Sequence, residues 1–208
     1  MNVYMSEQEQ LQAIRNWLKK YGPSVIIGIV IAFVASFGWR YWLQHQLQQR
    51  SQASMFYEQM LLNQSSHQNQ QATQFGNELM QKYQQTPYAV LAGLTLANQA
   101  VEQGDLTLAA KNLQWVIENA HDKAIQVIAK LRQARILLAQ NKPQDALKLL
   151  NTINDKNFLP EIAIVKGDAF IALGDKTSAR AVYQQALNTL PPNATIKSMV
   201  KMKLDATA

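Results

Sequence analysis

An uncharged stretch of nineteen residues, Tyr21 to Trp39, constrains the fold of this 208-residue chain more than any other feature. A helix rises about 1.5 Å per residue, so this stretch would span about 28 Å, close to the hydrocarbon thickness of a bilayer. A buried core helix of this length would have a polar face. A cleavable signal peptide would have a shorter apolar run that ends at a small-x-small cleavage site. The stretch therefore predicts a retained transmembrane helix over residues 21–43.

The residues that follow this stretch are typical of a membrane boundary. Aromatic rings concentrate at the lipid headgroups, and basic side chains remain in the water beside them. We expect the membrane interface at this end of the helix to consist of Trp39, Arg40, Tyr41 and Trp42.

Positive charge at the two flanks predicts the orientation of the helix. The N-terminal flank carries Arg15, Lys19 and Lys20, whereas the other flank carries only Arg40 and then Arg50. Because positive flanks stay in the cytoplasm, this small excess favours a cytoplasmic N-terminus. Residues 1–20 are then a cytoplasmic tail with a short interfacial helix. Residues 44–208 lie on the opposite side of the membrane.

Composition excludes several classes of site. The chain has no cysteine, so it has neither disulfides nor thiolate metal sites. Residues 44–208 carry sixteen Lys or Arg and twelve Asp or Glu, with the two signs interspersed. A nucleic-acid interface usually gathers its basic residues on one stripe. We therefore expect a membrane but no nucleic acid among the partners.

No group of residues resembles a catalytic or cofactor site. The histidines, His45, His67 and His121, are scattered and lack the i, i+4 spacing of a zinc-binding pair. There is no glycine-rich phosphate loop and no G-x-S-x-G elbow. The sequence predicts a protein that is not an enzyme and has no metal or cofactor.

A glutamine-rich segment follows the transmembrane stretch, with fourteen Gln between residues 44 and 85. Such bias can indicate disorder. Here the apolar residues keep a helical period on both sides of the polar stretch 63–70. We interpret residues 44–86 as a helical hairpin or linker.

Regularly spaced turns begin after Pro87. Turn residues recur at Gly104-Asp105, Asn141-Lys142 and Gly174-Asp175, with intervals of 37 and 33 residues. Each interval fits two helices and a turn. Small residues at matching positions would let the two helices of each pair pack closely. These packing positions are Ala97, Ala109, Ala134, Ala146, Gly167 and Ala179.

This spacing resembles the tetratricopeptide repeat, whose period is about 34 residues. Such helix pairs cannot bury their apolar faces alone, so they stack into a solenoid. The sequence thus predicts an all-α fold, in which a single N-terminal transmembrane helix precedes a tetratricopeptide-like solenoid. The repeat domain would occupy residues 87–208 and end in a capping helix from about Thr195 to Leu204.

The resemblance also implies a binding surface. In tetratricopeptide arrays the first helices of the pairs line a concave groove that holds a partner. The corresponding positions are Leu91, Leu94, Asn98 and Val101 in the first pair, Ile128, Leu131, Arg135 and Leu138 in the second, and Glu161, Ile164, Asp168 and Ile171 in the third. Whether this groove is open, or filled by the domain's own helices, stays undecided at this point.

The layout of nearly the whole chain resembles the YfgM family of ancillary SecYEG translocon subunits. The resemblance rests on the membrane stretch ending in Gly38 to Trp42, on Arg50 to Ser54, on Leu131 to Arg135 and on Gly174 to Arg180. It implies a single-pass protein of the bacterial inner membrane, with a cytoplasmic N-terminus and a periplasmic repeat domain.

The implied function is that of a scaffold. Members of this family would associate with the SecYEG translocon and with the membrane-anchored periplasmic chaperone PpiD, and would pass secreted client proteins to periplasmic chaperones. The alternative is an envelope scaffold or stress-signalling regulator that binds a different partner through the same repeats.

Overall fold

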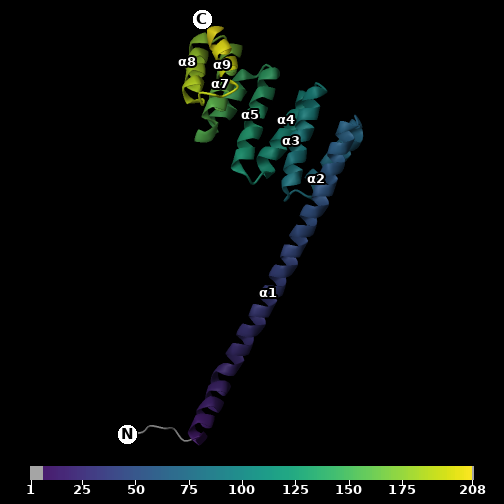
Figure 1. Ribbon diagram of the computed structural model, residues 1–208, viewed down its shortest axis with the longest axis vertical. Helices are drawn as coiled ribbons and strands as arrows, with labels where there is room; N and C mark the ends of the chain where they lie inside the picture. The colour runs from purple at the N-terminus through teal and green to yellow at the C-terminus, as the bar shows by residue number, and fades with distance from the viewer. Residues whose placement is uncertain (1–6, 208) are drawn as a thin grey trace, which may run out of the picture. The chain divides into compact units, whose positions relative to one another are not determined.

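The computed structural model describes residues 7–207, and this range contains helices and no strand (Figure 1). The all-α prediction is confirmed. The helices are α1 (Glu7–Ser65), α2 (Asn69–Lys82), α3 (Pro87–Glu102), α4 (Leu106–Asn119), α5 (Lys123–Ala139), α6 (Pro143–Asn151), α7 (Leu159–Ala172), α8 (Lys176–Thr189) and α9 (Lys197–Asp205), with a short 3-10 helix, Lys156–Phe158, before α7.

The chain divides into two compact units, Met1–Ser51 and Gln52–Ala208. In the first unit, α1 is the one described helix that is long and apolar enough to cross a membrane. Between Leu11 and Leu47, the large apolar side chains that the structure describes are exposed, with Val34 and Phe37 each at 68%. Pro23 lies inside the helix without ending it. Residues 7–20 therefore continue the apolar helix and do not form the separate interfacial helix that we expected.

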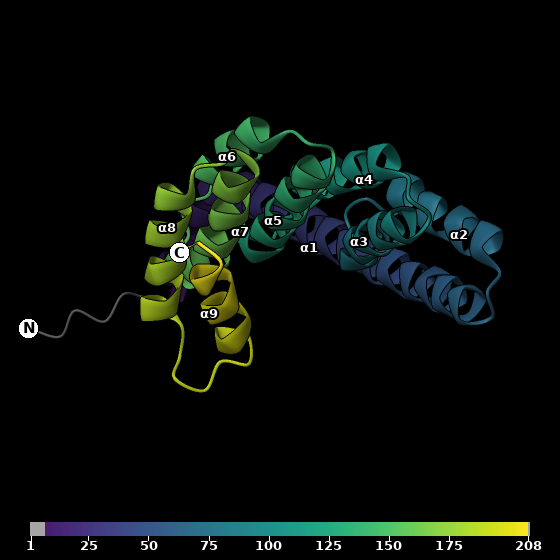
Figure 2. The ribbon, with the colours of Figure 1, turned by 90° about the horizontal axis from the view of Figure 1, so that it is seen from above.

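The second unit begins inside α1 and stacks its helices in sequence order. Seen from above, α3, α5 and α7 form one row and α4, α6 and α8 form the other (Figure 2). From α2 onward each helix packs against the next along the chain, and α5 also packs against α7. This arrangement is the solenoid that the spacing of the turns predicts.

The turns inside the helix pairs share one backbone geometry. The first residue of each turn dipeptide is left-handed, with φ of 78° at Gly104 and Gly174 and 58° at Asn141. The amide of the following residue then donates to a carbonyl five residues back, as Asp105 N does to Ala100 O at 2.9 Å. Asp105 and Asp175 next cap the second helix through their carboxylates.

The same turn occurs a fourth time, in the glutamine-rich hairpin. His67 has φ of 59°, and the amide of Gln68 donates to the carbonyl of Asn63 at 2.8 Å. The left-handed residues His67, Gly104, Asn141 and Gly174 lie 37, 37 and 33 residues apart. Residues 52–82 are thus a further helix pair of the solenoid, and only residues 44–51 of the expected hairpin lie outside this unit.

Facing residues of each pair are complementary in size. All six predicted packing positions, Ala97, Ala109, Ala134, Ala146, Gly167 and Ala179, are buried. About two turns into the second helix, Leu113 packs in one cluster with Ala97 and Leu150 in one cluster with Ala134. Tyr183, at the matching position, occupies the space left by Gly167. The first hairpin reverses this order, since its large residue is Met60 on the first helix and its glycine is Gly76 on the second.

The left-handed turn residues give a test of the repeat geometry. We expect Gly174→Ala to destabilise the solenoid by about 1 kcal/mol, because a Cβ is unfavourable at this positive φ although space around it is free. Asn141→Gly should cause no loss, because it removes the Cβ at the equivalent position. Melting temperatures of the full chain in detergent, followed by circular dichroism, measure both. Equal losses in the two variants would contradict the shared turn geometry.

Candidate binding surface

The structure separates the twelve residues of the expected groove by burial. Five are exposed, namely Leu91, Asn98, Val101, Arg135 and Ile171. Five are half-buried, namely Leu94, Ile128, Leu138, Glu161 and Asp168. The remaining two, Leu131 and Ile164, are only 4% exposed. The exposed part of the expected groove therefore contains fewer residues than the sequence predicts.

Leu131 and Ile164 belong to the hydrophobic core, so the expectation that they line a partner-binding groove is corrected. Leu131 packs with Ala146, Leu150 and residues of α7. Ile164 packs with Ala179, Tyr183 and Val200 of α9. Each of the two lies three residues before a small packing residue, Ala134 or Gly167. Residues three apart share one face of a helix, and this shared face points into the helix pair.

The C-terminal helix α9 covers the third pair. Asp168 accepts a hydrogen bond of 2.6 Å from the hydroxyl of Tyr183 and forms an ion pair with Lys203 of α9. Burial, followed by the hydrogen bond to Asp168, raises the pKa of Tyr183 well above its ordinary value. Because Asp168 is paired on both sides, its charge is compensated within the chain and does not serve as a free contact for a partner.

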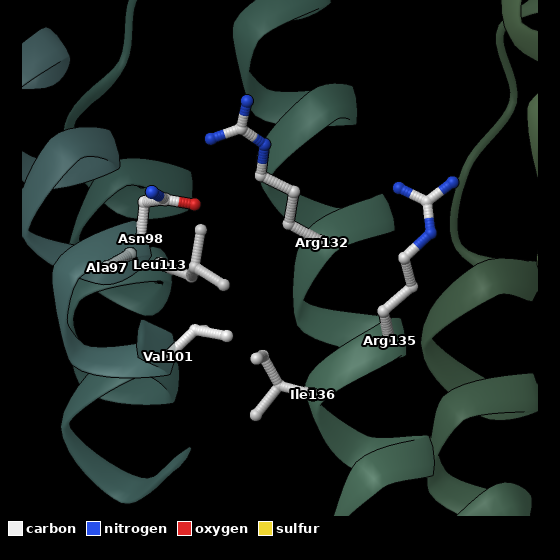
Figure 3. A pocket seen from close by; sticks show the side chains of 7 residues that line it. All are labelled: Ala97, Asn98, Val101, Leu113, Arg132, Arg135 and Ile136. Atoms are coloured by element: carbon white, nitrogen blue, oxygen red, sulfur yellow. The ribbon is translucent and has the colours of Figure 1, made fainter. Parts of the chain in front are cut away.

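A pocket of about 320 Å³ opens between α3 and α5. Within residues 7–207, α3 and α5 are not among the closely packed helix pairs, whereas α5 and α7 are. Figure 3 shows the lining of this pocket, which includes the expected groove residues Asn98, Val101 and Arg135. The lining residues are Ala97, Asn98, Val101, Leu113, Arg132, Arg135 and Ile136.

Sequence reasoning missed Arg132 as a member of this pocket. Its signal was present, because Arg132 and Arg135 lie three residues apart and therefore on neighbouring positions of α5. Chemically, the pocket offers an apolar floor and two cationic groups. In residues 7–207, no three His, Cys, Asp or Glu side chains gather in a way that could hold a metal ion. The arrangement is suited to binding.

The expected membrane-interface residues lie in the other unit of the chain. Trp39, Tyr41 and Trp42 are 65%, 76% and 49% exposed, and the rings of the two tryptophans lie 5.3 Å apart between centroids. Arg40 is also exposed. Exposed aromatic rings beside an apolar helix are what a lipid headgroup region accommodates.

Together these features define a helical repeat protein that carries one apolar helix able to span a membrane. The family model described as "Tetratricopeptide repeat-like domain" matches residues 15–208. A relative in Aggregatibacter actinomycetemcomitans, named "Ancillary SecYEG translocon subunit", is 35% identical over 89% of this chain and 91% of its own length. Relatives of the same name are 32% identical in Haemophilus influenzae and 28% identical in Escherichia coli K12, each over at least 98% of both chains.

This chain belongs to the tetratricopeptide repeat-like family and, within it, to the ancillary SecYEG translocon subunits. The expected family resemblance is confirmed. One apolar helix near the N-terminus fits a protein of the inner membrane. No solved structure matches the chain.

Proposed function

We propose that this protein is an inner-membrane scaffold that associates with the SecYEG translocon through a repeat domain on the periplasmic side. The observation that carries the proposal is the match to relatives of that name along almost the whole chain, which includes both the apolar helix and the solenoid. The excess of positive charge at Arg15, Lys19 and Lys20 supports a cytoplasmic N-terminus.

The chemistry of the solenoid supports a role in binding and not in catalysis. Exposed apolar residues on the row of first helices, Leu91, Val101 and Ile171, are 37%, 42% and 42% exposed. Apolar groups that stay exposed in the free domain can stabilise a complex by leaving water when a partner arrives. We infer that this row contacts the chaperone PpiD or secreted client proteins, which the scaffold passes from the translocon to periplasmic chaperones.

A crosslinked pull-down of the full chain tests this function. The chain carries an affinity tag after Ala208, and membranes are crosslinked before they are solubilised. Translocon subunits and PpiD should dominate the recovered proteins. In intact spheroplasts, added protease should remove the tag, because the C-terminus is periplasmic. A tag that is protected in spheroplasts and cleaved in lysed cells would contradict the orientation.

Two variants test whether the recovery of partner proteins in the pull-down depends on the exposed apolar residues of the first helices. Leu91→Ser/Val101→Ser/Ile171→Ser should keep its melting temperature within a few degrees, because the three side chains are exposed, and should recover less PpiD or client protein. Leu108→Ser on α4, where Leu108 is 39% exposed, is the matched control on the other row. Equal recovery by the triple variant and the control would place the partner surface elsewhere.

A further inference from the structure

The pocket between α3 and α5 combines two kinds of lining. Figure 3 shows the guanidinium groups of Arg132 and Arg135 and the amide of Asn98 along one part of the opening. Along the other part lie the methyl groups of Leu113, Val101 and Ile136. A volume of about 320 Å³ is at the lower end for ligand pockets, so it suits one or two side chains.

Among the described residues, no ion pair compensates the positive charge at this pocket. Helix α5 carries Lys123, Lys130, Arg132 and Arg135 and no acidic residue. Within residues 7–207, the ion pairs are Lys82–Glu78, Lys148–Asp145 and Lys203–Asp168, and neither arginine takes part in one. The nearby carboxylate of Glu102 accepts a hydrogen bond from Asn98, at 2.7 Å.

Two like charges at i and i+3 repel each other, so an anion between them would stabilise α5. A guanidinium group is weakly hydrated and presents a planar set of donors that matches a carboxylate in a bidentate geometry. The apolar floor beside the arginines favours a second group without charge. A single anion, such as free phosphate, would leave that floor in water.

We propose that this pocket binds a segment of a partner protein in which an acidic side chain lies beside an aliphatic or aromatic one. The carboxylate contacts Arg132 and Arg135, and the apolar side chain packs against Val101, Leu113 and Ile136. This inference rests on the proposed binding function and deepens it, since it states which sequence chemistry the repeat domain selects.

A peptide panel tests the selection directly. The probes are fluorescein-labelled twelve-residue peptides, capped at both ends, with one Glu and one Leu or Phe placed one to four residues apart in a Ser, Gly and Gln background. Fluorescence anisotropy measures their binding to the full chain in detergent. At least one spacing should bind, and its twins with Gln for Glu or Ser for the apolar residue should bind at least about tenfold more weakly. High salt should reduce the advantage of Glu.

Charge reversal gives a readout that unfolding cannot imitate. Arg132→Glu/Arg135→Glu should prefer the twin with Lys in place of Glu over the parent peptide. Both arginines are exposed and form no ion pair within the described part of the chain, so the melting temperature should change little. Arg180→Glu on α8, which is also exposed and outside the pocket, is the matched control and should bind like the unchanged chain.

Three results would overturn the inference. One is binding of no peptide in the panel, and another is equal binding of the Glu and Gln twins. The third is stronger binding of a peptide that has a free C-terminal carboxylate and no Glu, which would refute an acidic side chain as the ligand. If any of these occurs while the pull-down still recovers the translocon, the pocket assignment fails and the proposed function stands.

Discussion

The double variant Leu131→Ser/Ile164→Ser should leave most of the solenoid unfolded at room temperature. Each residue is 4% exposed in the structure. Truncating a large buried aliphatic side chain typically costs about 2 to 5 kcal/mol. The two residues lie in different core clusters, so their effects should nearly add and approach the total stability of a typical domain, about 5 to 15 kcal/mol.

Circular dichroism of the full chain in detergent, with thermal unfolding, measures this effect. The helical signal from residues 7–51 should remain, because their apolar side chains contact detergent. Leu91→Ser/Val101→Ser is the control, in which two apolar residues of α3 are lost from the surface. If the core variant melted like this control, Leu131 and Ile164 would be surface residues, and both could line an open groove.

Gly167→Ala should cost about 3 kcal/mol, the upper part of the range for overpacked cores. A Cβ at this position would lie 2.3 Å from Cε1 of Tyr183 and 2.6 Å from its Cζ. The ring cannot easily move away, since Tyr183 is 2% exposed and its hydroxyl is held by Asp168. The melting temperature should fall by about 6 to 12 °C for a domain of this size.

A second substitution tests whether Gly167→Ala destabilises the fold through a steric clash with Tyr183 or through the loss of the glycine itself. Gly167→Ala/Tyr183→Leu recreates the Ala and Leu combination of the two preceding pairs, and it should recover much of the stability. Gly76→Ala is a milder control, because its Cβ would meet side-chain atoms of Leu96 and Met60 at 2.9 to 3.1 Å, and their ends can shift. A double variant less stable than Gly167→Ala alone would contradict this account of the pairs.

The parts of the fold that depend on local chemistry could be predicted from the sequence. An uncharged stretch as long as a bilayer is thick leaves few alternatives for Tyr21 to Trp39. Glycine and aspartate at Gly104-Asp105 and Gly174-Asp175 indicate a left-handed residue followed by a helix cap, and the structure has both. Such patterns depend on residues close together in the sequence, so they can be interpreted without knowledge of the neighbouring helices.

The glutamine-rich segment could be predicted as a hairpin but not as the first helix pair of the solenoid, because its residues differ from the other pairs at the matching positions. His67 takes the left-handed position that glycine or asparagine occupies elsewhere. Met60 takes the place of a small residue, and only Gly76 on the facing helix compensates for its volume. The spacing of the residues does not reveal that the large and the small residue have changed places. This is apparent only from the contact between Met60 and Gly76.

The groove was predicted too broadly for a related reason. A helical period identifies which residues share a face, but it does not say which face meets the neighbouring pair. Leu131 and Ile164 recur in step with the turns, and both readings of that recurrence, groove and core, were consistent with the sequence. The pocket beside Arg132 depends on a gap between α3 and α5, which is a property of tertiary packing.

The order of packing along the solenoid has a consequence for how the chain acquires its structure. Among the described helices, most close contacts join sequence neighbours, and those between α5 and α7 and between α7 and α9 skip only one helix. The loops that must close are therefore short, and the entropy lost in closing them is small. Chains with such low contact order fold quickly, and each helix pair can form as soon as its own residues and those of the preceding pair are available. The N-terminal pairs can thus be in place before the C-terminal helix has left the ribosome.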